Sequence, residues 1–196
     1  MIKDSNSTKV LFLGDKDCSL ISWLEGNGEK ILQTTEKISP DFILSNNIDI
    51  VVSYGYRHIL RKNILDLLPN KFFNLHISFL PWNRGADPNF WSFFDQTPKG
   101  VSIHLIDEGI DTGDIIAQRE IEFDLSNETL ASSYIKLHSS IKQLFIENWC
   151  DIKNEKKSLD AFHKTFSGVK PGDIYSIYQC LCSKHPFYNG DIYPII

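Results

Sequence analysis

The sequence lacks any long apolar stretch. Its first ten residues, MIKDSNSTKV, have neither the apolar core nor the small-residue cleavage site of a signal peptide. No later run approaches the roughly 20 apolar residues that a membrane-spanning helix needs. We therefore expect a cytoplasmic location and no membrane partner.

Cysteine is scarce, and its spacing does not match the common metal-binding patterns. The four cysteines are Cys18, Cys150, Cys180 and Cys182. They form no pair of CxxC elements, and the single residue between Cys180 and Cys182 is too short a spacer for a zinc knuckle. Because cytoplasmic thiols are kept reduced, we predict structural thiols and no metal site.

Positive charge is in the minority. Lys and Arg total 20 against 25 Asp and Glu, which gives a formal net charge of −5. This balance argues against a continuous nucleic-acid-binding surface. It does not exclude a small anionic ligand, because a few basic side chains can bind a phosphate within an acidic protein. With 42% hydrophobic residues in a chain of 196, the composition predicts a globular chain with a sizeable core.

Strand-like and helix-like segments alternate along the chain, which is typical of an α/β fold. Strands are predicted at residues 9–13, 48–53, 72–77, 101–106 and 115–123, the last one at an antiparallel edge. Helices are predicted from Ser19, from Pro40 behind a Ser39 cap, at 63–68, at 128–149 behind a cap at Ser126 or Asn127, and at 173–182. We expect residues 78–91 to form a loop and 151–160 a charged connection. The lone Gly14 after the first strand is no GxGxxG fingerprint, so nothing indicates a nicotinamide cofactor.

One group of polar residues suggests chemistry. Since side chains alternate along a strand, Asn74 and His76 share a face at the end of the strand at 72–77. A loop with Leu80-Pro81 and Gly85 follows, and Asp111-x-Gly113 comes later. A neutral His can take a proton from an attacking amine, an Asn amide can stabilise an oxyanion, and a carboxylate can orient the His. This set fits acyl transfer to an amine, without a serine or cysteine nucleophile.

Each of these residues also has a structural interpretation. Asn74 could be a hydrogen-bonded residue at the end of a strand, and His76 a hydrogen-bonded core histidine. Asp111 could serve the turn before Gly113, since Asp and Gly are common in turns. His104 shares a strand face with Ser102, and we favour a supporting or structural role for it.

The segments FNLHISFLPWNRG and GVSIHLIDEGIDTGDI resemble the 10-formyltetrahydrofolate-dependent formyltransferase family. The family signature is Asn-x-His, a Ser-Leu-Leu-Pro-like loop and a distal Asp-x-Gly; here Phe79 replaces the first Leu of the loop. The resemblance implies a Rossmann-like open, mostly parallel sheet flanked by helices, with a short C-terminal extension. It also implies that Asn74, His76 and Asp111 are catalytic and that 10-formyltetrahydrofolate is the formyl donor, with no metal.

Within that family, SYGYRHIL and PWNRGADPNFW most resemble the branch that formylates amino groups on nucleotide-linked sugars for surface polysaccharides. The resemblance implies folate contacts, mostly from the backbone, at His58, Ile59, Leu60, Asp107, Glu108, Gly109 and Ile110. It implies acceptor contacts at Trp82, Arg84 and Asp87. It divides the chain into a catalytic core at 1–150 and an extension at 151–196 that packs on the core.

Other functions remain open from the sequence. A glycinamide ribonucleotide formyltransferase or a formyltetrahydrofolate hydrolase would share the three catalytic residues, and a folate-binding or nucleotide-sugar-binding module without catalysis would share the fold. We expect no tRNA substrate, because this sequence carries no oligonucleotide-binding-like domain after the core. Either the edge strand at 115–123 or the C-terminal tail could form a homodimer interface.

Overall fold

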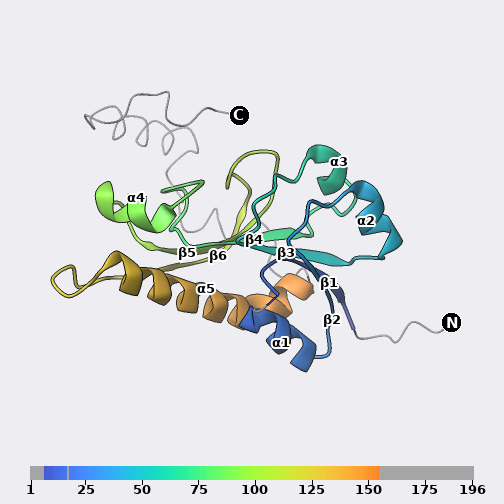
Figure 1. Cartoon of the computed structure of the whole chain (residues 1–196), viewed down its shortest axis with the longest axis horizontal. Helices are drawn as coiled ribbons and strands as arrows, with labels where there is room; N and C mark the ends of the chain where they lie inside the picture. Colours follow the sequence, from blue (N-terminus) through green and yellow to red (C-terminus); the bar gives the residue numbers. More distant parts are fainter. Residues whose placement is uncertain (1–6, 17, 155–196) are drawn as a thin grey trace. The chain divides into compact units, whose positions relative to one another are not determined.

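A six-stranded sheet forms the centre of the computed structural model, which describes residues 7–16 and 18–154 (Figure 1). The order of the strands across the sheet is β2-β1-β3-β4-β5-β6. The strands are β1 (Lys9–Gly14), β2 (Lys30–Thr34), β3 (Ile50–Tyr54), β4 (Phe72–His76), β5 (Gly100–Leu105) and β6 (Ile115–Glu120). The first four in the chain are parallel neighbours, and β5 and β6 add antiparallel pairs at one side. The predicted open, mostly parallel α/β sheet is confirmed.

Helices cover both faces of this sheet (Figure 1). The helices α1 (Ser19–Gly26) and α5 (Leu130–Lys153) lie against one face. The other face carries α2 (Pro40–Ser45), α3 (Lys62–Leu65) and α4 (Pro88–Phe94). A parallel sheet needs such cover on both sides, because its central strands are apolar on both faces.

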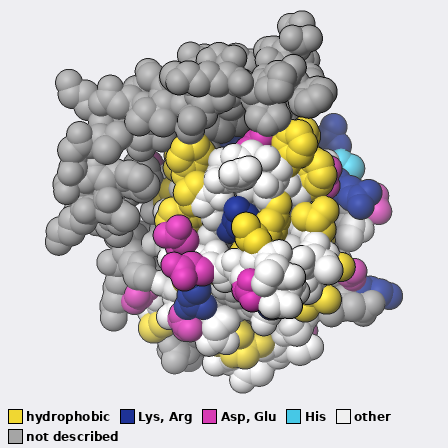
Figure 2. Space-filling model, turned by 90° about the vertical axis from the view of Figure 1, so that its left-hand side faces the viewer, with side chains coloured by type: hydrophobic (Ala, Val, Ile, Leu, Met, Phe, Trp, Pro, Cys, Tyr) yellow, Lys and Arg dark blue, Asp and Glu magenta, His cyan; other side chains and the backbone are white. Residues whose placement is uncertain are grey.

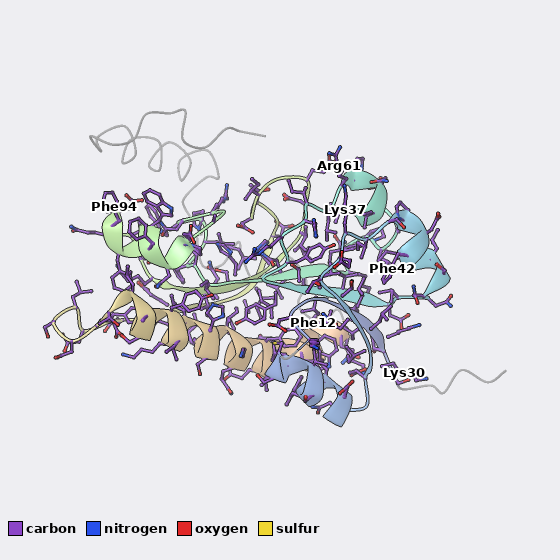
Figure 3. The ribbon with its side chains drawn as sticks, viewed as in Figure 1. Phe12, Lys30, Lys37, Phe42, Arg61 and Phe94 are labelled. Carbon is purple, nitrogen blue, oxygen red and sulfur yellow. The ribbon has the colours of Figure 1, made fainter. Side chains whose placement is uncertain are left out.

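Each face has its own hydrophobic core, set by the alternation of side chains along the strands. Val10 and Phe12 pack toward α1 and α5, and Figure 3 shows Phe12 in that layer. Leu11 and Leu13, the intervening residues, pack with residues of α2 and α3. All four side chains are fully buried. The run of apolar residues in β1 therefore fills both cores at once.

Two helix starts test the predicted caps. Ser39 caps α2 as predicted: its hydroxyl accepts the Phe42 amide at 3.3 Å, and Pro40 opens the helix. The predicted cap of α5 was wrong. Thr129, not Ser126 or Asn127, accepts the Ser132 amide at 3.0 Å, and Ser132 completes a capping box.

Several segments differ from the predicted elements. Strand β6 ends at Glu120 and helix α3 at Leu65, short of the predicted ends at 123 and 68. Strand β2 was not predicted, because it is an edge strand whose side chains are only partly buried. The predicted loop at 78–91 contains the start of α4, where Asp87 and Pro88 begin a helix that sequence alone did not indicate. Helix α5 continues to Lys153, beyond the predicted end at 149 and into the predicted connection.

Predictions for the tail from 155 onward, including the helix at 173–182, lie outside the described residues. In the part of the chain that the structure describes, no helix is both long and apolar enough to cross a bilayer.

Candidate active site

The strand register brings polar side chains together at the end of β4. Asn74 lies opposite His104 of β5, and His76 lies opposite Ser102. Because paired residues on neighbouring strands point to the same face, all four side chains project from the face that carries α2 and α3. The amide Nδ2 of Asn74 is 3.2 Å from Nε2 of His104.

Asp111 reaches this group from the turn between β5 and β6. Its backbone is in the left-handed region, with φ 50°. Oδ1 accepts the Asn74 amide at 3.1 Å and lies 3.3 Å from Nε2 of His104. Oδ2 lies 3.6 Å from Nδ1 of His76. Asn74, His76 and Asp111, predicted to act together, therefore meet in one polar group.

The loop after β4 also contacts this group of side chains. The carbonyl of Asn83 lies 3.3 Å from Nε2 of His76, and the amide of Gly85 donates to Oδ2 of Asp111 at 2.9 Å. Both ionisable side chains are largely shielded from water, with exposed fractions of 9% for the His76 side chain and 13% for the Asp111 side chain.

Burial and charge set the protonation of the two groups in opposite directions. Burial lowers the pKa of His76 below that of an ordinary histidine, and His104 and Arg84 act the same way, whereas Asp111 and the Asn83 carbonyl oppose the shift. Burial by itself raises the pKa of Asp111, but the hydrogen bond to His104, the charge of His76 and the Gly85 amide together bring it well below the usual carboxyl range. At neutral pH the site therefore holds a neutral imidazole beside a carboxylate.

These states make a defined set of chemical groups. A neutral imidazole can accept a proton, and the adjacent carboxylate favours the imidazolium that results. The Asn74 amide is a hydrogen-bond donor for an oxygen that gains charge. His104 contacts both Asn74 and Asp111, which agrees with the supporting role favoured from the sequence. Its position on the same strand face as Ser102 was the signal in the sequence, and the strand register then places it opposite Asn74.

A cavity of about 400 Å³ lies beside the Asp111 turn, between α3 and the chain after β5. Three of the predicted folate residues line it: Asp107, Glu108 and Gly109. Its walls also include Lys62, Leu65 and Phe72. Of the other predicted folate residues, Leu60 is buried, whereas Ile59 and Ile110 are 68% and 49% exposed and His58 is exposed.

The three predicted acceptor residues lie on the loop that leads from β4 to α4. Trp82 donates its amide to the Phe79 carbonyl at 3.1 Å, and Asp87 stands before α4 with a left-handed backbone. The Nε atom of Arg84 is buried without a hydrogen-bond partner among the described residues. Figure 2 looks onto the end of the fold that carries α4, where Phe90 and Phe94 are each 43% exposed.

The described residues contain no group of three His, Cys, Asp or Glu side chains placed to hold a metal ion.

The chain was compared with models of known protein families. The model of the formyl transferase family matches residues 30–148, which include the three polar residues of the site. The chain belongs to the formyl transferase family. The match runs from β2 into α5, so all the strands that form the site lie within it.

Relatives within the formyl transferases carry different names. The chain is 35% identical over 145 residues to the methionyl-tRNA formyltransferase of Finegoldia magna, covering 74% of this chain but 41% of that protein. It is 43% identical to the crystal structure of the formyltransferase PseJ from Anoxybacillus kamchatkensis, determined with UDP-4,6-dideoxy-4-formamido-L-AltNAc and tetrahydrofolate. That match has a TM-score of 0.73 and covers 76% of this chain and 79% of PseJ.

A third match shows the fold alone. The phosphoribosylglycinamide formyltransferase of Streptococcus pneumoniae is 20% identical, with a TM-score of 0.57, covering 71% of this chain and 95% of that one. Formyl transferases with three different names thus match this chain, and the family by itself does not determine the acceptor.

Proposed function

We propose that this chain is a sugar N-formyltransferase. It moves the formyl group of 10-formyltetrahydrofolate to the amine of a nucleotide-linked amino-deoxysugar. The observation that carries the proposal is the group of Asn74, His76 and Asp111 at the end of β4, in which Asn74 donates to Asp111 and Asp111 lies 3.6 Å from His76. The acceptor class rests on the 43% identity to PseJ, whose structure contains a UDP-linked formamido sugar.

The three residues have separate roles in the proposed reaction. The amine nitrogen attacks the formyl carbon, and the carbonyl oxygen of the formyl group becomes an oxyanion. Asn74 turns its amide from Asp111 toward this oxyanion; loss of one such donor typically costs about 10²–10³ in rate. His76 takes the proton from the attacking nitrogen, and Asp111 stabilises the imidazolium that forms.

Collapse of the intermediate completes the transfer. The bond between the formyl carbon and N10 of the folate breaks, and its electron pair stays on N10. His76 returns its proton to that nitrogen, which leaves tetrahydrofolate and a sugar formamide. No outside oxidant or reductant is needed, and the histidine ends as it began.

The donor is proposed to bind beside the Asp111 turn. The cavity of about 400 Å³ has the size of a small-ligand pocket. One of its walls is formed by residues 107–109, just before Asp111 in the chain. Leu65, Phe72 and Ile106 give it apolar walls suited to the flat pterin ring. The backbone groups at Asp107, Glu108 and Gly109 would then hydrogen-bond the ring edge.

The acceptor is proposed to bind along the loop from β4 to α4. Arg84 is the first choice for a phosphate contact, because it is the only Lys or Arg between residues 78 and 91. A phosphate oxygen would form a charge-assisted hydrogen bond with its guanidinium group. Trp82 and Asp87 flank Arg84 on the same loop.

A panel of acceptors tests the proposal. The purified chain is incubated with 10-formyltetrahydrofolate and, separately, UDP- and dTDP-linked 3-amino and 4-amino sugars, glycinamide ribonucleotide, methionyl-tRNA, or no acceptor. We expect a formamide product, detected by mass spectrometry, with an amino-sugar nucleotide. Transfer only to methionyl-tRNA or glycinamide ribonucleotide would reject the sugar acceptor, and formate release without any acceptor would identify a hydrolase.

Two variants separate catalysis from binding. Asn74→Ala and His76→Ala should lose transfer while still binding tetrahydrofolate. If both retain the wild-type rate, the proposed roles are wrong. A wild-type chain that binds folate yet transfers formyl to none of these acceptors would instead be a binding module.

A further inference from the structure

The chain leaves the sheet after β4, and its backbone groups must then find partners outside the strand ladder. Two side chains on the neighbouring strands provide them. The Ser102 hydroxyl donates to the Ser78 carbonyl at 2.7 Å and accepts the Leu80 amide at 3.1 Å. Nε2 of Gln118 donates to the Leu80 carbonyl at 2.7 Å and to the Ser102 hydroxyl at 2.9 Å.

In this network both hydrogens of the Gln118 amide and all hydrogen-bonding positions of the Ser102 hydroxyl have partners. Ser102 and Gln118 are paired residues in the ladder of β5 and β6, so their side chains lie on one face. The Gln118 amide has two hydrogens, and each has its own acceptor. Ser102 is fully buried and uses its hydrogen and both lone pairs. Removing one member would leave buried groups without partners, which is costly in a site shielded from water.

The segment held by the network continues into the residues that touch the active site. A few residues after Leu80, the Asn83 carbonyl meets Nε2 of His76 at 3.3 Å. Gly85 then donates its amide to Asp111. The other end of this segment is tied by Thr97, whose hydroxyl donates to Oδ1 of Asn83 at 2.6 Å.

The contact with Asn83 favours one position for the proton of His76. A carbonyl oxygen only accepts hydrogen bonds and lies within hydrogen-bond distance of Nε2, whereas Asp111 lies farther from Nδ1, so the neutral ring with its proton on Nε2 is favoured. The lone pair is then on Nδ1, which lies 3.6 Å from Oδ2 of Asp111. A proton taken up at Nδ1 would therefore form the imidazolium directly beside the carboxylate.

We propose that Gln118 is a positioning residue for formyl transfer. Through Leu80 and Ser102 it holds the Asn83 carbonyl against His76 and so fixes the tautomer of the imidazole. Gln118 touches none of the reacting atoms itself. This inference rests on the proposed function, in which His76 moves the proton.

Kinetics of Gln118 variants give the first test. Gln118→Met keeps the length of the side chain and removes both donors, and Gln118→Glu replaces them with acceptors. We expect kcat to fall roughly ten- to a hundredfold, because small misplacements of catalytic groups cost that much, while KM for the folate donor stays the same. Arg119→Gln is the matched control: Arg119 is the next residue on β6, pairs with Glu147 at the surface at 2.5 Å, and should leave kcat unchanged.

The second test measures the tautomer of the His76 ring directly and does not depend on enzyme activity. Nitrogen-15 NMR of the histidine rings, with His76 assigned from a His76→Gln variant, should show one Nε2-protonated form in the wild type. Gln118→Met should give a mixture of both tautomers; if that variant does not fold, Gln118→Glu carries the test. A wild-type kcat in the Gln118 variants, or an unchanged tautomer, would overturn the proposal. If the wild-type chain transfers no formyl group, the proposed function fails, and the NMR result still decides whether Gln118 positions His76.

Discussion

The Gly85 amide donates to Oδ2 of Asp111 at 2.9 Å, although the two residues are 26 positions apart in the chain. Through Oδ1 the same carboxylate accepts the Asn74 amide. Asp111 therefore links the turn between β5 and β6, the end of β4 and the loop that follows β4. Its side chain has both a structural and a proposed chemical role.

Removing the charge of Asp111 tests its chemical role. Asp111→Asn keeps the shape of the side chain but replaces one acceptor oxygen with a donor, so it weakens the hydrogen bond from either Gly85 or Asn74, and the imidazolium of His76 loses its counter-charge. We expect kcat for formyl transfer to fall about a hundredfold or more, within the range for acid–base catalysis. Asp114→Asn, three residues later and exposed, is the control. A near-wild-type rate for Asp111→Asn would contradict the role given to its charge.

Gly113 should not tolerate a side chain. A Cβ at this position would stand 2.0 Å from the Leu105 carbonyl oxygen, so the turn that carries Asp111 would have to move away from β5. Gly113→Ala should therefore lower kcat and weaken folate binding, measured by steady-state kinetics and by fluorescence titration with tetrahydrofolate. Gly26→Ala serves as the control, because a Cβ there meets nothing within 4 Å. Equal activities of the two variants would show that the turn can shift without consequence.

The depressed pKa of His76 predicts how stability depends on pH. In the unfolded chain the histidine takes up its proton near pH 6.5, whereas in the folded chain it does so only at lower pH. His76 therefore contributes stability above about pH 6.5 that is lost as the pH falls toward its folded pKa. Urea unfolding of the wild type should show a lower free energy of unfolding at pH 5.5 than at pH 7.5. His76→Gln should make this dependence smaller; an unchanged dependence would mean that His76 is not the group responsible.

Glu29 should matter for stability and not for chemistry. Its carboxylate is buried, accepts the Thr8 amide at 2.8 Å and Nε1 of Trp149 at 3.1 Å, and pairs with Lys153 at 2.7 Å. Glu29 therefore links the C-terminal end of α5 to the backbone just before β1. Glu29→Gln turns a donor toward groups that need acceptors and should cost roughly 1–3 kcal/mol in urea unfolding. The exposed Glu25→Gln should cost little, and both variants should keep the wild-type KM for folate.

The local parts of the fold were predictable because they depend on nearby residues. The cap at Ser39 and the shared face of Asn74 and His76 both follow from short-range geometry, and both are confirmed. The start of α4 was missed because the segment 78–91 is rich in Gly and Pro, and its helix is fixed by contacts far along the chain. Asn89 donates to the Leu130 carbonyl of α5 at 2.9 Å, a pairing that no window of the sequence contains.

By itself the sequence determined which residues could do chemistry and which of them share a strand face, because the alternation of side chains is a property of the local backbone. The resemblance of its motifs then indicated the family. Only the tertiary structure decided that Asp111 meets Asn74 and His76, that His104 joins them, and that Gln118 supports the loop above them. Those contacts depend on the order and register of strands distant in the chain, and no local periodicity encodes that order.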